Sequence, residues 1–257
     1  MRKLLLGALA ALVLISGASA ASANTVAGSA RGVDPQADAT AAGVVRTLLV
    51  GADIFMGDML KTGPEGQVEI IFSDNTKLVV GPNSSLEIQS YLLRNDGTAS
   101  KLALDVLGGT FRFITGNSPH SAYQINTPTG TIAVRGTAFE GFVGEDGIAH
   151  LMMLKGSTEM CDKHKKVCKI LEAICQVGEI GNGDTTVIGN AADLTKAQRD
   201  ALRKFFMYAE NEAPLDHEFR VPVAYDCMHQ QPKLSANPTS TSSGTATEGD
   251  DCEGEGG

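Results

Sequence analysis

The stretch QVEIIFSDNTKLVVG, residues 67–81, most limits what this chain can fold into. Apolar residues occupy alternate positions on both of its arms: Val68, Ile70 and Phe72, then Leu78 and Val80. Alternation with a period of two around a short polar segment predicts a β-hairpin. Ile71 and Val79 make the second face apolar as well, so we expect this strand pair to be covered on both sides, as in stacked sheets.

The turn of this hairpin sets its register. A two-residue turn would set Phe72 opposite Lys77, whereas a three-residue turn at Asp74–Thr76 would set it opposite Leu78. Because register follows the buried face, the sequence favours the three-residue turn, with Asn75 in the left-handed conformation.

Short apolar runs broken by Gly, Asn and Asp continue over residues 44–190, which predicts an all-β domain. The short spacing favours stacked antiparallel sheets, either a sandwich or a compact rolled sheet. Besides the hairpin, we expect strands at 44–50, 86–92, 101–106, 110–114, 122–126, 131–143 and 148–154.

A C-terminal extension, residues 191–231, carries the one expected helix, near 194–210. Thr195 and Gln198 have the spacing of a capping box. An apolar stripe follows at helical spacing, so the helix is expected to pack on the β-domain. The stripe contains Leu194, Ala201, Leu202, Phe205 and Tyr208 or Ala209.

The two ends of the chain have different compositions. Residues 1–23 combine Arg2 and Lys3 with a short apolar run and small-residue exits, which predicts a signal peptide cleaved after Ala20 or Ala23. An uncleaved anchor is the alternative, although the apolar run is short for a membrane span. Residues 24–43 are expected to form a flexible leader, and residues 232–257 a disordered acidic tail.

Charge and hydropathy limit the partners. The formal charge is −9, and it becomes more negative when the signal peptide removes two cations. An acidic chain repels phosphate backbones, which argues against nucleic-acid binding. Beyond the signal peptide no stretch approaches the length of a membrane span, so we expect a periplasmic or secreted protein of a bacterium without a transmembrane segment in the mature chain.

The stretch TPTGTIAVRGTAFEGFV, residues 127–143, changes the phase of its apolar residues. Ile132 and Val134 stand at even positions, whereas Phe139 and Val143 stand at odd ones. Such a change requires an inserted residue, and Gly136 predicts a β-bulge there. We expect Arg135 to donate to carbonyls that the broken ladder leaves unpaired, so its role would be to stabilise a bend.

This stretch resembles the FecR domain of bacterial envelope signalling proteins, through a Thr-Pro-x-Gly followed by a Gly-Thr-x-Phe. The residues that match are Thr127, Pro128, Gly130, Gly136, Thr137 and Phe139, with Arg135 between them. GADIFMGDMLKTGPEGQVEIIFSDNTKLVVGPNSSLEI, LGGTFRFI and LMMLKGSTEM resemble other parts of the same family, so the resemblance runs through most of residues 48–180. It implies a stand-alone extracytoplasmic FecR-like module in which the motif residues are structural.

Two departures from the family limit what can be carried over. Asp74-Asn75 stands where the family commonly has Asp-Gly. The signal peptide leads almost directly into the domain, without the cytoplasmic anti-sigma and transmembrane segments of the well-studied members. The resemblance therefore implies the extracytoplasmic module alone.

Five cysteines are present in a chain expected to be oxidised. Cys161 and Cys168 flank a polar tip, and a cross-strand disulfide between them is the first expectation. Cys175 and Cys227 could form a second bridge, which leaves Cys252 over.

Two alternatives remain open for this cysteine region. Cys161, Cys168 and His164, with Cys175, could bind a metal ion, although the spacing is loose. Residues 167–177 also have a helical apolar pattern, and a helix there would put Cys168 and Cys175 on one face.

The sequence contains no recognisable catalytic arrangement. His120, His150, His164, His217 and His229 lack a supporting motif, so each is expected at the surface or in a turn. We therefore expect no enzyme and no cofactor.

The leading hypothesis is an interaction module that signals through an envelope or membrane protein. The alternative is a structural or polysaccharide-binding envelope protein, which an exposed pair among Tyr91, Phe111 and Phe113 would favour.

Overall fold

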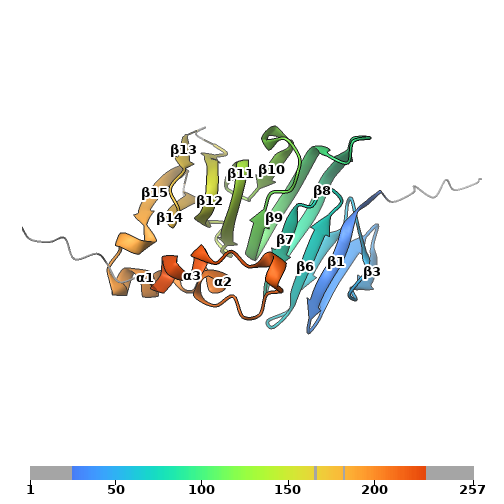
Figure 1. Cartoon of the computed structure of the whole chain (residues 1–257), viewed down its shortest axis with the longest axis horizontal. Coiled ribbons are helices and arrows are strands. Elements are labelled where there is room, and N and C mark those ends of the chain that lie inside the picture. Colours follow the sequence, from blue (N-terminus) through green and yellow to red (C-terminus); the bar gives the residue numbers. More distant parts are fainter. Residues whose placement is uncertain (1–24, 165–166, 182, 230–257) are drawn as a thin grey trace, which may run out of the picture.

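The computed structural model describes residues 25–164, 167–181 and 183–229, and fifteen strands form a single sheet within them (Figure 1). The strands are β1 Val26–Asp34, β2 Ala37–Ala41, β3 Val44–Thr47, β4 Asp53–Phe55, β5 Met59–Thr62, β6 Gln67–Phe72, β7 Lys77–Val80, β8 Ser85–Leu93, β9 Ala99–Ile114, β10 Tyr123–Asn126, β11 Gly130–Val143, β12 Ala149–Asp162, β13 Cys168–Leu171, β14 Gln176–Gly181 and β15 Asp184–Asn190.

The sheet is rolled because its long strands pair with different neighbours along their length; β11, for example, pairs with β10 at its start and with β9 at its end. The first half of β9 pairs with β8 and its second half pairs with β7 and β11. In the same way β12 pairs with β14 at its start and with β13 at its end. One apolar core cluster joins the two halves of the sheet, for example Leu60 of β5 with Phe113 of β9. The all-β prediction is confirmed.

A bulge in β11 produces the phase change that the sequence predicts. The register with β12 breaks between Arg135 and Ala138, and Gly136 has a φ of 68°. Val134 before the break and Phe139 after it both reach the core. Residues at even positions after the bulge therefore face outward.

The β6–β7 hairpin has the predicted turn length but a different register. Ile70, not Phe72, lies opposite Leu78, and the turn is shifted toward the first strand by one residue. The buried carboxylate of Asp74 accepts hydrogen bonds from the backbone N–H (3.2 Å) and the hydroxyl (2.9 Å) of Thr76. These bonds hold Thr76 in the second arm instead of the turn. The slip is two residues, so the apolar faces are those predicted, and Asn75 is left-handed with a φ of 64°.

The expectation of a flexible leader over residues 24–43 is wrong for the part that the structure describes. Strand β1 pairs with both β4 and β6, and β2 pairs with β3 and β5. The side chains of Ala27, Ala30 and Ala39 are fully buried. Small residues concealed these strands because alanine gives little of the hydrophobic alternation that marks a strand. The β-domain therefore begins at Val26, not at residue 44.

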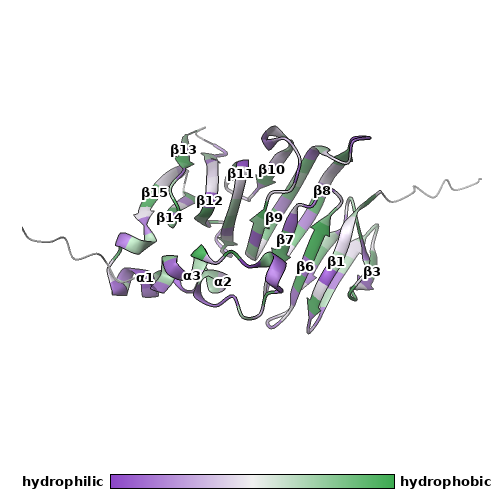
Figure 2. Ribbon diagram, viewed as in Figure 1, coloured by the Kyte–Doolittle hydropathy of each residue, from purple (hydrophilic) through white to green (hydrophobic). Residues whose placement is uncertain are grey.

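The described part of the C-terminal extension, residues 191–229, contains three α-helices, α1 Lys196–Leu202, α2 Met207–Glu210 and α3 Val223–His229, and not one continuous helix. The predicted capping box of Thr195 and Gln198 begins α1. Helix α1 ends at Leu202, and α2 begins after Phe206, whose φ of −127° and ψ of 64° are not helical. The backbone N–H of Tyr208, in the first turn of α2, donates to the carboxylate of Glu140 on β11 at 2.8 Å. In Figure 2 the ribbon of α1 is mostly hydrophilic, whereas that of β6 is mostly hydrophobic.

No helix within residues 25–164, 167–181 and 183–229 has the length and hydropathy needed to cross a bilayer. The expected signal peptide with Ala20 and Ala23, the acidic tail 232–257 and Cys252 lie outside the described residues.

Candidate interaction site

The outward face of the sheet has an apolar part that α1 and α3 cover (Figure 1). Ala138 and Leu154 of the long strands pack there with Leu202, Phe206 and Met228. A disulfide between Cys175 and Cys227, with their Cα atoms 5.1 Å apart, joins α3 to the sheet. The helices α1 and α3 therefore form a second apolar core with the sheet, and a disulfide links α3 to the sheet covalently.

The remainder of the outward face carries charged and polar side chains, with the apolar Ile71 and Val79 among them. We call it the polar face, and it consists of Gln67, Glu69, Lys77, Arg112 and Glu140 on strands β6, β7, β9 and β11. Each of these residues alternates with core residues of its own strand. Residues 207–221, which we call the strap, cross the polar face between α1 and α3 (Figure 1).

Arg112 lies at the centre of the polar face, directly opposite Glu140 of the neighbouring strand. Its guanidinium is fully buried and pairs with the carboxylate of Glu140 at 3.0 Å and with that of Glu212 from the strap. Burial raises the pKa of Glu140, while the charge of Arg112 opposes that effect. One polar atom of Arg112, Nε, has no hydrogen-bond partner among the described residues.

Two further polar-face residues bind the strap. Glu69 accepts a hydrogen bond from the backbone N–H of Asp216 at 2.9 Å, and the Gln67 amide oxygen accepts one from the Tyr208 hydroxyl at 2.7 Å. Burial raises the pKa of Glu69 to about 7, and the negative charges of Asp216 and Glu218 add to the effect. Glu69 therefore exchanges a proton near neutral pH.

Apolar anchors on the strap complete the contact. Leu215 and Phe219 are buried and pack with Val79 of β7 and with Tyr208. This cluster is much smaller than the one beneath α1 and α3. The strap is therefore held by few apolar side chains and by many polar groups.

Comparison with known families identifies the central part of the chain. Residues 58–159 match the model of the FecR protein family. Over these residues, which we call the FecR domain below, the chain is similar to that family. No curated protein matches the chain.

Solved structures give a weaker likeness. Two crystal structures of a candidate anti-sigma factor from Parabacteroides distasonis align with 13% identity and TM-scores of 0.42 and 0.41. The alignments cover 56% and 55% of this chain and 64% and 62% of those chains, so this chain spans less than two thirds of their length. At these TM-scores the likeness carries no argument, and the family assignment rests on the sequence match.

The first half of the motif closes a turn within the FecR domain. The Thr127 hydroxyl accepts a hydrogen bond from the Gly130 backbone N–H at 3.0 Å, and Pro128 is exposed at the tip. A Cβ at Gly130 would lie 2.4 Å from the Cys161 carbonyl oxygen, so the neighbouring strand admits only glycine there. These contacts are all internal to the fold.

The second half of the motif forms the bulge and the core behind it. Gly136 lies against the ring of His120, and the backbone carbonyl of Thr137 accepts a hydrogen bond from Thr115. Phe139 packs edge-on against Phe111 with ring centroids 5.9 Å apart.

The expected role of Arg135 is wrong. Its side chain is 53% exposed and pairs with the Glu159 carboxylate at 3.1 Å, not with backbone carbonyls. Val134 is buried in the core, so alternation along the strand places the side chain of Arg135 on the opposite face, where it pairs with Glu159 of the adjacent strand.

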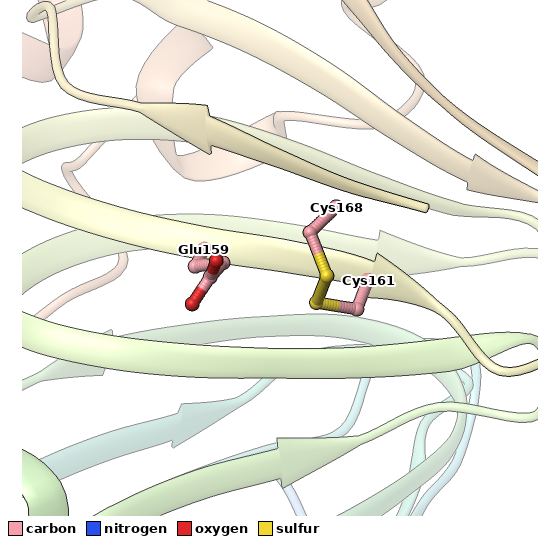
Figure 3. A group of neighbouring side chains, drawn as sticks. All are labelled: Glu159, Cys161 and Cys168. Atoms are coloured by element: carbon pink, nitrogen blue, oxygen red, sulfur yellow. A yellow bond between two sulfur atoms is a disulfide. The ribbon is translucent and has the colours of Figure 1, made fainter. Parts of the chain in front are cut away.

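Both expected cysteine pairs are present, and residues 167–177 do not form a helix. Cys161 lies directly opposite Cys168 in the β12–β13 pair, with their Cα atoms 4.1 Å apart and their sulfurs joined (Figure 3). Glu159 offers a carboxylate oxygen within 4.8 Å of both sulfurs, which is the geometry of a small metal site. The disulfide engages both thiols, so this group has no thiolate for a metal in the oxidised chain. His164 is exposed outside this group, and Cys175 pairs with Cys227 instead.

The aromatic residues proposed for glycan binding are core residues. Tyr91, Phe111 and Phe113 are at most 1% exposed. The polysaccharide-binding alternative therefore loses the residues on which it was based.

His150 is also not where the sequence placed it. It is buried on β12, stacks on Phe205 with ring centroids 3.8 Å apart and lies 3.5 Å from Glu179. Burial lowers its pKa despite the nearby carboxylate. His120, His164 and His217 are exposed, and His229 is half-buried against Tyr225.

Sequence reasoning missed the polar face. Its signal is a single charged residue at an outward position within each apolar run, as in V-E-I at 68–70, F-R-F at 111–113 and F-E-G-F at 139–142. An isolated charge in an apolar strand also fits a solvated face, so the sequence alone does not reveal that the strap covers it.

Proposed function

We propose that this protein is a non-catalytic FecR-type signalling module that is exported to the cell envelope and acts by binding a partner protein. The FecR domain over residues 58–159 carries the proposal, because that family indicates a regulatory role. The polar face supports it, since this surface of the domain holds a segment of the same chain.

Two observations support export. Residues 1–23 have the charge and hydropathy order of a signal peptide. The pairs Cys161–Cys168 and Cys175–Cys227 lie at disulfide distance, which fits an oxidising compartment.

A binding role also agrees with the state of the buried carboxylates. Glu140 is engaged by Arg112 and by the backbone of Tyr208, and Glu69 by the backbone of Asp216. General acid–base chemistry requires such a group to reach a substrate proton. With the strap in place, both carboxylates are bound by other groups of the protein, so their role is to hold the strap on the sheet.

Photo-crosslinking in cells tests the proposal. The complete chain would carry a photoreactive amino acid at an exposed position such as Leu92, Leu107 or Ile188. We expect a discrete adduct with an envelope protein from at least one position, and none from the buried control position Ile88. Adducts with polysaccharide alone, or a chain retained in the cytoplasm, would contradict the proposal.

A further inference from the structure

We infer that the polar face is a peptide-binding surface, that the strap is its intramolecular occupant, and that the partner protein presents a segment of the same chemistry there. This inference rests on the proposed function, because it states where the FecR domain meets its partner and which chemistry the partner segment has.

The polar face holds the strap mainly through the backbone of the strap. Two carboxylates of the face accept strap N–H groups, and three donors of the face reach strap carbonyls. Main-chain hydrogen bonds of this kind give a bound segment affinity, and its side chains add specificity. The five contacts are Glu140 with Tyr208, Glu69 with Asp216, Gln67 with Pro214, Lys77 with Glu218 and Arg112 with Phe219.

Three strap side chains add specificity. The carboxylate of Glu212 pairs with the buried Arg112, and Leu215 and Phe219 fill the apolar contacts beside Val79. The chemistry that fits the polar face is therefore an acidic residue, an aliphatic residue three positions later and an aromatic residue four positions after that. A carboxylate in the partner segment would replace that of Glu212 on Arg112.

The strap and the helices α1 and α3 are held on the sheet by different kinds of contact. Helices α1 and α3 lie on an apolar surface and are tied by the Cys175–Cys227 disulfide. Ala209 at the start of the strap also packs in that apolar cluster, whereas the rest of the strap lies largely on charged groups, and apolar residues could often replace such groups with little loss if the contact never opened. The unsatisfied Nε of Arg112 shows in addition that the strap does not use the whole hydrogen-bonding capacity of the face.

The boundary of the family match separates the surface from its occupant. Glu69, Lys77, Arg112 and Glu140 all lie within residues 58–159, whereas the strap at 207–221 lies outside them. The polar face therefore belongs to the FecR domain, and the strap belongs to the extension of this particular chain.

The strap can open without leaving the molecule, because α1 and the disulfide-linked α3 hold its two ends. A segment tethered in this way has an effective concentration on the order of millimolar. A free peptide therefore competes poorly with the intact strap, and strap variants are needed to expose the surface.

A peptide-binding assay on the purified, oxidised mature chain tests the inference. The probe is a fluorescein-labelled peptide of residues 207–221, MYAENEAPLDHEFRV. The test variant is Leu215→Ala with Phe219→Ala, which removes the strap anchors. The matched control is Leu202→Ala, which weakens the apolar cluster under α1 instead. Glu212→Gln is a milder strap variant should the double variant not fold.

We expect the strap variant to bind the probe at least about tenfold more tightly than the wild type, because the tethered competitor is weakened. A probe with Glu212→Arg should bind at least about tenfold more weakly than the native probe, because it sets a cation against Arg112. The Leu202→Ala control should bind as the wild type does.

Three results would overturn the inference. The first is a folded strap variant whose strap amides exchange rapidly with solvent and which still binds no probe. The second is a Leu202→Ala control that binds the probe as tightly as the strap variant does. The third is a dimer that forms by exchange of straps and binds no probe, because the occupant would then be a second copy. The assay needs no partner, so its failure alongside a positive crosslink would mean that the partner binds elsewhere and the proposed function stands.

Discussion

Two arginines on neighbouring strands show how burial decides the importance of a residue. Arg112 is fully buried between Glu140 and Glu212, whereas Arg135 is half-exposed beside Glu159. Removal of one member of a buried ion pair leaves an uncompensated charge, but an exposed pair contributes little. Sequence reasoning selected Arg135 because it interrupts an apolar pattern, and it passed over Arg112 because nothing in the sequence shows what covers that position.

The first prediction compares the two arginines. We expect Arg112→Ala to lower the free energy of unfolding by about 3–5 kcal/mol, because Glu140 would remain buried without its cation. Arg135→Ala should lower it by less than about 1 kcal/mol, as for an exposed ion pair. Urea unfolding followed by circular dichroism measures both, and equal losses would contradict the assignment.

The second prediction concerns the protonation of Glu69. Its pKa in the folded chain is raised to about 7 from an ordinary value of 4.5, so the folded state binds the proton more tightly than the unfolded state. The stabilisation from this proton is complete below pH 4.5 and is lost as the pH rises through about 7. We therefore expect the contribution of Glu69 to stability to decrease across this range.

Glu69→Gln is the matched variant, since it keeps the shape of the side chain and removes its titration. Thermal unfolding at pH 4.5, 6 and 8 should show a smaller loss of stability in the variant than in the wild type. The protection of the Asp216 amide against hydrogen exchange, corrected for the intrinsic exchange rate, should also change less with pH in the variant than in the wild type. An unchanged pH profile would show that the strap does not desolvate Glu69.

Among the elements, the strands with strong alternation were predictable and those made of small residues were not. The sequence indicated the β6–β7 hairpin, the bulge at Gly136 and the capping box of α1, because each depends on local periodicity or on a local hydrogen bond. It did not indicate β1 and β2, whose buried positions are alanines and one glycine. It also did not indicate the contact between the start of α2 and Glu140, since Tyr208 and Glu140 lie far apart in the sequence.

The third prediction tests the status of β1 and β2. Deletion of residues 25–41 should unfold or aggregate the domain, because it removes the partner of β6 and leaves an unpaired edge over the core. Deletion of residues 232–257, which the sequence predicts to be a polar tail, is the matched control and should leave the unfolding transition unchanged. A soluble, cooperatively folded 25–41 deletion would support the original expectation of a leader.

At the scale of the whole molecule, two disulfides close segments of different length. Cys175–Cys227 spans 52 residues and links the extension to the sheet, whereas Cys161–Cys168 spans seven residues within one hairpin. The fold class and both pairings were accessible from the sequence, because strand alternation and the positions of cysteines are local information. The arrangement of charges beneath the strap was not, because it depends on contacts between segments that lie about 70 to 150 residues apart, such as Glu69 and Asp216.

The last prediction follows from this difference in loop length. A cross-link removes more entropy from the unfolded chain when it closes a longer loop, about 4 kcal/mol for the larger of these loops and about 2 kcal/mol for the smaller. The double variant Cys175→Ala with Cys227→Ala should therefore lose more stability than Cys161→Ala with Cys168→Ala. It should also increase the hydrogen exchange of α3 and of the strap, since that disulfide holds one end of both. Urea unfolding measures the loss of stability, and amide exchange measures the opening of α3 and the strap. If Cys161→Ala with Cys168→Ala loses as much stability and increases exchange of the strap as much as the other variant does, the Cys175–Cys227 disulfide does not hold α3 and the strap on the sheet.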